Sequence, residues 1–355
     1  MSAAADAAPL SPDAADSPQR VPISTILGFV AMGFGMFMAI LDIQIVSSSI
    51  SEIQAGLSAS SSEISWVQTS YLVAEVIMIP LSGYLSRMLS TRVFFCTATA
   101  IFTLMSFLCA TADSLDEMIV FRALQGFFSG ALIPTVFASG YQIFGRNRST
   151  TISVILGLTA TLAPTIGPTL GGYLTELFSW HWLFLINIIP GIVVTTAVWN
   201  LVDIDKPDPK LFENIDFAGF AFMATFLGSA EYVLEEGAHN DWWADGTIRT
   251  FTGLAIVGGI LFFWRALTHP NPIVDLRVYR NRNFAVGSTF AFVVGIGLYG
   301  IVYLLPLYLA RVRGMNALQI GEIMFVTGLF QFLASPIAGV MSRQGDPRAV
   351  IAVGF

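Results

Sequence analysis

The stretch Gly157-Leu-Thr-Ala-Thr-Leu-Ala-Pro-Thr-Ile-Gly-Pro-Thr-Leu-Gly-Gly172 lies inside an apolar run of the sequence and holds four glycines and two prolines. Pro164 and Pro168 each remove an amide donor and would break a helix in water. In a bilayer, neighbouring helices satisfy the freed carbonyl groups, so we expect a kinked membrane span. Gly167 and Gly171 are four residues apart, a spacing that lets a second helix approach closely. A packing seam without any further role is the alternative.

The composition places the whole chain in a membrane. Of its 355 residues, 55% are hydrophobic and 12% are charged, whereas soluble domains average about 25% charged residues. The net charge of −7 offers no basic patch for nucleic acid. An enzyme is not expected, because no nucleophile motif, Walker A motif or metal-ligand cluster occurs, and the two cysteines and three histidines are scattered. We therefore expect no metal and no cofactor.

Ten apolar runs are long enough to cross a hydrocarbon core of about 30 Å. They predict an all-α integral membrane protein, with an eleventh span beginning where the chain stops. The runs lie at residues 24–47, 64–85, 92–111, 116–141, 149–171, 181–201, 217–235, 249–267, 284–309 and 318–341. The predicted domains are a disordered cytoplasmic tail (1–22), an N-terminal six-helix bundle (23–202), a loop with two linker spans (203–270) and an incomplete C-terminal bundle (271–355).

Basic residues in the loops predict the orientation, because Lys and Arg collect on the cytoplasmic side. With the N-terminus inside, thirteen of the 17 Lys and Arg residues fall in inner segments and three in outer loops. Arg311 and Arg313 are the exceptions that share one outer loop. The N-terminus is therefore predicted to be cytoplasmic.

Two opposite charges lie inside the predicted spans. Asp42 in the first span and Arg122 in the fourth each lie about five residues from the outer end of their span, so both are at similar depth. Charges in spans are costly and are functional candidates, and we expect these two to pair or to share a water-filled cavity. Gln125 and Ser129 follow on the face of Arg122. An ion pair that only fixes packing is the alternative.

Glu75 lies near the middle of the second predicted span. Gln68 and Tyr71 precede it at seven and four residues, which places all three on one helix face. A carboxyl at that depth is suited to taking up and releasing a proton. A permanently protonated packing residue is the alternative reading.

Five stretches occur in the order of a known pattern. Leu41-Asp42-Ile-Gln-Ile-Val46 is similar to an LDxTIV motif, Arg122-Ala-Leu-Gln125-Gly126 to an RxxQG motif, and Gly157–Gly172 to an antiporter motif ending in GPxxGG, with similar tracts at Trp180–Asn187 and Asn271–Phe284. Together they make the sequence resemble the major facilitator superfamily, specifically its fourteen-span drug:proton antiporters of the EmrB/QacA type. Measured against that family, the chain lacks the last three spans and most of the eleventh.

Two family motifs are altered here. The cytoplasmic gating loop between the second and third spans usually reads GxLaDRxGRR, and in this chain it runs from Gly83 to Arg92. Arg87 stands in the place of the acid and Ser90 in that of the glycine. Gln44 likewise replaces the usual threonine of the first-span motif.

The resemblance implies a major facilitator fold and export of amphiphilic toxic compounds across an inner membrane in exchange for protons. The proton would be carried by Asp42 or Glu75 and influenced by Arg122, and the span with Pro164 and Pro168 would seal the path during alternating access. The implied partners are lipophilic small molecules, protons, lipid, a periplasmic adaptor protein and an outer-membrane channel. A proton-coupled transporter of a specific solute, such as a siderophore or metabolite, and a non-transporting sensor or scaffold are the alternatives.

Overall fold

The computed structural model describes residues 21–60, 63–145, 148–213, 215–315, 317–345, 350 and 354. All but two residues of the predicted N-terminal tail, and most of the predicted start of an eleventh span, therefore lie outside the described residues. Within the described residues every regular element is a helix, so the predicted all-α class is confirmed.

The ten predicted spans are confirmed as helices, although two of them are interrupted. The first six spans are α1 (Ile23–Ser48), α3 (Trp66–Leu89), α4 (Thr91–Ala110), α5 (Leu115–Ser129) with α6 (Leu132–Phe144), α7 (Ser149–Leu177), and α8 (Trp182–Leu185) with α9 (Ile188–Leu201). The last four are α11 (Phe217–Glu236), α12 (Gly246–Thr268), α13 (Arg282–Arg311) and α14 (Ala317–Gln344). Short helices α2 (Ile50–Gly56), α10 (Lys210–Glu213), η3 (Trp242–Ala244) and η4 (Leu276–Arg280) lie between spans.

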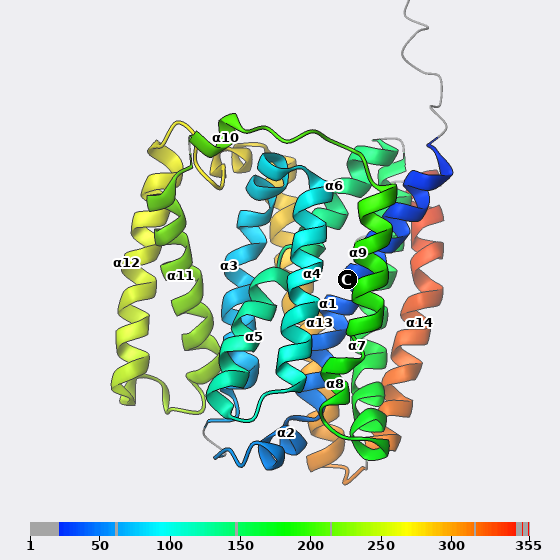
Figure 1. The fold of residues 1–355 in the computed structure, drawn as a ribbon, viewed down its shortest axis with the longest axis vertical. Helices are drawn as coiled ribbons and strands as arrows, with labels where there is room; N and C mark the ends of the chain where they lie inside the picture. The colour runs from blue at the N-terminus through cyan, green and yellow to red at the C-terminus, as the bar shows by residue number, and fades with distance from the viewer. Residues whose placement is uncertain are drawn as a thin grey trace, which may run out of the picture.

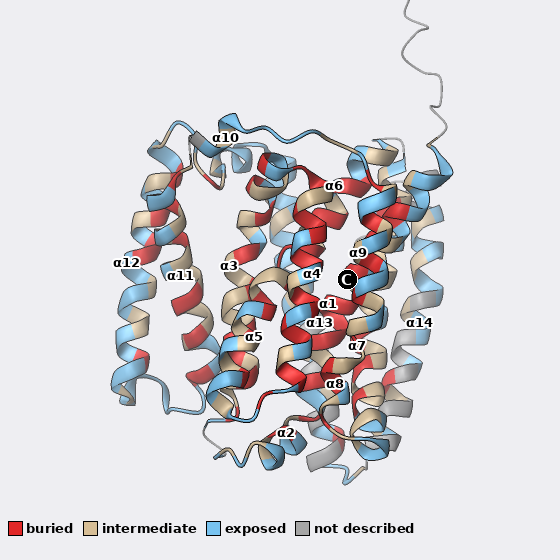
Figure 2. Cartoon of the chain, viewed as in Figure 1, coloured by how far each residue is buried: buried red, intermediate tan, exposed pale blue. Residues whose placement is uncertain are grey.

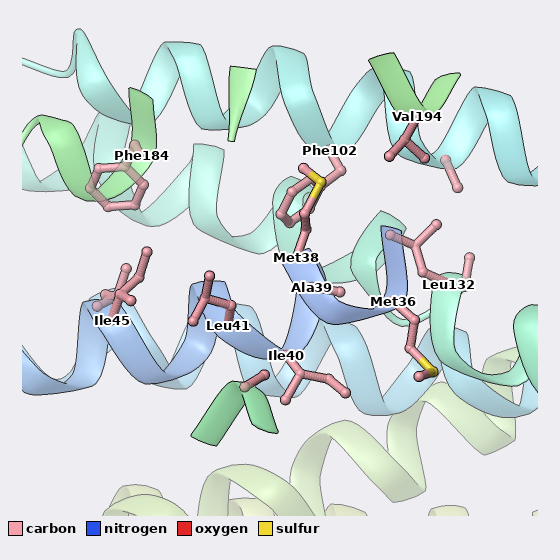
Figure 3. Close-up of a cluster of buried hydrophobic side chains, with 14 of the residues drawn as sticks. Met36, Met38, Ala39, Ile40, Leu41, Ile45, Phe102, Leu132, Phe184 and Val194 are labelled. Carbon is pink, nitrogen blue, oxygen red and sulfur yellow. The ribbon is translucent and has the colours of Figure 1, made fainter. Parts of the chain in front are cut away.

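Helix α1 lies at the centre of a bundle formed by α1 and α3 to α9, which we call the first bundle (Figure 1). Its sequence is apolar on every face, as expected of a helix surrounded by others, and Met32, Met36 and Ile45 are fully buried. Figure 3 shows side chains of α1 packed against Phe102, Phe184 and Val194 of α4, α8 and α9. The division of the chain into domains stays a prediction.

The remaining spans lie outside the first bundle. Helices α11 and α12 form one flank, where α11 packs on α3, and α14 forms the opposite flank against α7 (Figure 1). Pale blue, exposed residues are frequent on α12 and α14, whereas red, buried residues concentrate in the first bundle (Figure 2).

Three details correct the sequence analysis. The fourth span breaks at Gly130–Ala131 and the sixth at Ile186–Asn187. The stretch from Gly83 to Arg92 is almost entirely helical, because α3 and α4 are joined by Ser90 alone. Glu236, one residue beyond the predicted span at 217–235, is the buried last residue of α11, where it accepts a hydrogen bond of 2.8 Å from Thr69 Oγ1.

Candidate functional site

The predicted pairing of Asp42 and Arg122 is confirmed. Arg122 Nη1 of α5 donates to Asp42 Oδ2 of α1 at 2.6 Å, and both side chains are completely buried. The interior of the first bundle thus holds a full salt bridge. A buried pair requires further hydrogen bonds for its remaining polar atoms, because desolvation costs several kcal/mol for each ion.

Those further bonds come from a set of side chains that we call the buried polar network: Asp42, Ser106, Arg122, Gln125 and Asn187. Asp42 Oδ1 accepts from Asn187 Nδ2 at 2.7 Å and from Gln125 Nε2 at 3.2 Å. Gln125 Oε1 accepts from Arg122 Nη1 at 2.7 Å, and Ser106 Oγ accepts from both amides, at 3.1 and 3.0 Å. The network joins α1, α4, α5 and the break between α8 and α9.

Sequence reasoning missed two members of this network. Asn187 appeared only as the end of the Trp180–Asn187 tract, and Ser106 was one of several small polar residues in the third span. The available signal was an amide side chain in an otherwise apolar run, since buried amides need partners. The break at Asn187 supplies the local reason: the residue lies between two helices and turns its side chain to Asp42.

The guanidinium of Arg122 is enclosed by aromatic rings as well. Its Cζ lies 4.1 Å from the ring centre of Tyr71 and 5.8 Å from that of Phe184. A cation over a ring face is attracted by the ring quadrupole, most strongly where water is excluded. Arg122 Nε also donates to the carbonyl of Val67 at 3.1 Å.

Glu75 borders this network from α3. The carboxyl is buried, and its oxygen Oε1 has no hydrogen-bond partner among the described residues. Tyr71 Oη donates to Ser129 Oγ at 2.5 Å, and Ser129 also interacts with the Glu75 carboxyl. The predicted shared face is therefore confirmed for Tyr71 and Glu75, while Gln68 is only half-buried.

Gly126 of α5 and Gly130, the residue that follows α5, bring α3 close enough for these contacts. A Cβ on Gly126 would collide with the backbone carbonyl of Tyr71, and one on Gly130 would lie 2.5 Å from the carbonyl oxygen of Glu75. The backbones touch where a side chain would separate them. The RxxQG stretch therefore supplies both the charged residue and the close approach.

The antiporter-motif stretch lies along α1, and its glycine spacing had predicted the close approach of another helix. A Cβ on Gly167 would collide with Gln44, and one on Gly171 with Ser48. Helix α7 runs unbroken through Pro164, which is buried, and Pro168, which is half-buried. A Cβ added to Gly157 or Gly172 would meet open space. The role of this motif in conformational change stays a prediction.

The predicted gating residues lie at the face of the first bundle that holds the start of α1, which we call the predicted cytoplasmic face. Arg87 Nε donates to the carbonyl of Gly83 at 3.0 Å, and Arg92 Nη1 lies 3.9 Å from Asp203 Oδ1. Gly83 and Arg87 line a cavity of about 520 Å³ together with Asp205 and other residues. The gating role itself stays a prediction.

No group of three or more His, Cys, Asp or Glu side chains that could hold a metal ion was found in the part of the chain that the structure describes. Both cysteines, Cys96 and Cys109, are buried and free. The chemistry that the site offers is therefore that of carboxyl groups, a guanidinium and amides.

Comparison with known proteins places this arrangement in a family. Residues 32–355 match the model described as Major Facilitator Superfamily. The Colistin resistance protein EmrB of Acinetobacter baumannii is 47% identical over 95% of this chain and 66% of its own length. The Multidrug export protein EmrB of Haemophilus influenzae is 31% identical over 93% of this chain and 64% of its own. The chain thus spans just under two thirds of these relatives.

Solved structures agree on the fold. The peptide transporter POT in complex with sulfate superposes with a TM-score of 0.60, at 17% identity, over 93% of this chain and 71% of that one. Identity at this level speaks for the fold alone. The relatives named EmrB bear out the resemblance to the EmrB/QacA type that the motifs indicated.

Proposed function

Because the chain belongs to the Major Facilitator Superfamily, we propose that the protein is a multidrug efflux transporter that exports amphiphilic toxic compounds in exchange for protons. The observation that carries the proposal is the Asp42–Arg122 pair, wholly buried inside membrane spans with the carboxyl of Glu75 nearby. Charges at that depth are costly and mark the paths of ions and substrates. Relatives named for colistin resistance and multidrug export support amphiphiles as the substrate class.

The proposed mechanism couples two binding events. A carboxyl, Asp42 or Glu75, takes a proton from outside and releases it inside, and the positive charge of Arg122 influences that carboxyl. Proton and drug bind in competition, so uptake of the proton expels the drug. The helix that holds Pro164 and Pro168 acts as the flexible seal between the two access states. The proton gradient is the energy source, without a further cofactor.

We also propose the setting. The excess of basic residues in the segments assigned to the inside supports a cytoplasmic N-terminus. The likeness to the EmrB proteins of Acinetobacter baumannii and Haemophilus influenzae supports an inner membrane. A periplasmic adaptor protein and an outer-membrane channel are the proposed partners.

The test uses everted membrane vesicles that contain the full-length protein, with an imposed proton gradient followed by a pH-sensitive dye. Tetraphenylphosphonium and ethidium, both lipophilic cations, are added in turn, and vesicles without the protein are the control. We expect the wild type to dissipate the gradient when a cation is added. A variant that lacks the carrier carboxyl, Asp42→Asn or Glu75→Gln, leaves the gradient intact.

If neither cation affects the gradient although the inserted protein is folded, drug export by proton antiport is wrong. A transporter of a specific solute, or a non-transporting sensor or scaffold, then takes its place. A scaffold would tolerate loss of both Asp42 and Arg122, whereas a specific transporter would not.

A further inference from the structure

Several buried polar atoms lack hydrogen-bond partners among the described residues, and two of them belong to neighbouring ionisable groups of opposite charge in the interior of the first bundle. One is Arg122 Nη2, a cationic donor, and the other is Glu75 Oε1, a carboxyl acceptor. Both side chains are buried, Arg122 completely and Glu75 with 7% exposed. Buried polar groups are normally paired, so each such atom calls for an explanation. A donor and an acceptor that interact electrostatically supply that explanation for each other.

Asp42, by contrast, has partners for both of its oxygens. Its Oδ2 accepts from Arg122 Nη1 at 2.6 Å, and its Oδ1 accepts from Asn187 and Gln125. A proton on Asp42 would remove the negative charge that pairs with Arg122. Arg122 would then be a buried cation without its counter-ion, which is expensive. The geometry therefore holds Asp42 in its ionised form.

Glu75 has the surroundings of a group that changes charge. It faces Arg122 and Ser129 of α5, Asp42 of α1 and Glu231 of α11, with Tyr71 one turn away on its own helix. Arg122 is the one cation among these and favours the carboxylate. The two acids, and the burial of the carboxyl, favour the protonated form. Because these influences oppose each other, Glu75 can adopt both the protonated and the ionised form.

We infer that Glu75 carries the proton and that Asp42 remains the permanent counter-ion of Arg122, an inference that rests on the proposed function. When the protonated carboxyl releases its proton to the cytoplasm, the resulting carboxylate turns to Arg122 Nη2. When a proton from outside binds Oε1, the O–H bond forms, the contact with Arg122 breaks and Glu75 is neutral again. One proton is taken up and one released in each cycle.

Arg122 thus serves two acids with two different nitrogens. Its Nη1 stays with Asp42, and its Nη2 alternates between an empty and a paired state. The Tyr71 ring, 4.1 Å from the guanidinium, and the Tyr71–Ser129 hydrogen bond hold both side chains in register. Tyr71 and Ser129 are therefore positioning residues.

The experiment measures proton release and drug binding on the same sample. Purified full-length protein in lipid nanodiscs is placed in a weakly buffered solution with a pH dye, and tetraphenylphosphonium is added. Equilibrium dialysis measures how much of the cation is bound. We expect the wild type to release protons on binding. Glu75→Gln should bind the cation without any release, and its affinity should no longer depend on pH.

The neutral pair variant Asp42→Asn/Arg122→Gln is the matched control, because it leaves no buried charge unpaired and so avoids the folding defect expected of Asp42→Asn alone. It should still release protons, with a shifted pH profile, since Arg122 no longer favours the carboxylate. Glu75→Asp should restore part of the release.

Two results would overturn the inference. If Glu75→Gln releases as many protons as the wild type, another group carries the proton. If the Asp42→Asn/Arg122→Gln variant binds the cation but has lost release at every pH of the profile while Glu75 is intact, Asp42 is the carrier. Should the wild type bind neither tetraphenylphosphonium nor ethidium, the proposed function fails, and the inference falls with it; the binding measurement separates these cases.

Discussion

The first bundle and the helices that follow it are stabilised in different ways. The core of the first bundle is a single cluster of buried hydrophobic side chains. Its members come from the whole stretch between Phe29 and Val202, and they surround the buried polar network. The cluster between α11 and α12 contains only Met223, Phe262 and Ala266 as buried members. Along α13 large apolar side chains are exposed, among them Ile296 at 61% and Leu304 at 60%.

The difference follows from which contacts stabilise a protein in a bilayer. Lipid tails are as apolar as leucine, so an apolar side chain gains little by leaving lipid for a protein core. Polar groups gain much more, because they find no partner in lipid. The first bundle is therefore specified by a few polar contacts and glycine approaches, whereas α12 and α13 are specified mainly by length and apolarity. Four substitutions test this contrast.

The largest effect is expected from Asp42→Ala, which leaves Arg122 buried without its counter-ion. The loss in unfolding free energy should be about 3–5 kcal/mol. Cys109, whose Sγ lies 3.7 Å from Gln125 Oε1, reports the opening of this region through its reaction with a thiol-specific dye during heating. Asp203→Asn is the control, because the exposed Arg92–Asp203 pair is worth less than about 1 kcal/mol. Equal melting of both variants would contradict the contrast.

Gly126→Ala should follow, because the new methyl group would collide with the backbone of Tyr71. Overpacking of this kind costs about 1–3 kcal/mol. Gly295→Ala in α13, where a Cβ meets open space, should be neutral or slightly stabilising, since alanine favours helix. Thermal melting followed by circular dichroism compares the two. A stable Gly126→Ala variant would mean that α3 and α5 are not held by backbone contact.

Ser90→Gly should stabilise the protein. Ser90 joins α3 to α4 with φ 76° and ψ 148°, a conformation that glycine adopts readily and other residues rarely. The gain should be about 1 kcal/mol, reduced by loss of the long 3.4 Å bond from Val93 N to Ser90 Oγ. Ser86→Gly, inside α3, should instead destabilise, because glycine disfavours helix. Both melting temperatures moving down would argue against strain at the junction.

The smallest effect concerns pH and the start of α12. The amide of Ile248, which donates to Asp245 Oδ1 at 3.0 Å, and then that of Thr247 hold the pKa of Asp245 below its ordinary value of 3.8. The carboxylate cap therefore contributes stability above pH 3.8, and that contribution is lost as the pH falls through the lowered pKa. Hydrogen exchange at the first turn of α12, corrected for intrinsic rates, should rise at low pH in the wild type. Asp245→Ala should raise exchange at every pH. If exchange in the first turn of the wild type does not change at low pH, the Asp245 carboxylate does not stabilise the start of α12.

Much of the fold was predictable, because the physics involved is local. Runs of about 20 apolar residues gave the ten spans, and equal depth in antiparallel spans gave the Asp42–Arg122 pair. The spacing of Gly167 and Gly171 predicted the close approach of another helix, and the structure identifies that helix as α1. Each of these follows from counting along one or two segments.

The rest depended on contacts between distant segments. Asn187 contacts Asp42 across 145 positions of the sequence. A helical repeat within one segment cannot predict such a contact. The unpaired state of Glu75 Oε1 is likewise a property of what surrounds it. The stretch from Gly83 to Arg92 was assigned to a loop from its resemblance to the family motif, whereas in the structure Ser90 alone joins the two helices.

The segment between α9 and α11 connects these two helices and also forms hydrogen bonds with α3 and α4. Asp205 accepts hydrogen bonds of 2.8 Å from both the amide and the hydroxyl of Thr91, and the Asp208 amide donates to the Arg87 carbonyl at 3.2 Å. Tyr84 Oη bonds the carbonyl of Leu211 at 2.5 Å. These bonds tie the segment that precedes α11 to the adjoining ends of α3 and α4, and α11 itself packs on α3. If the chain works by alternating access, as proposed above, the linker helices move together with the first bundle, and a distance label placed after Thr268 is the one that follows the motion.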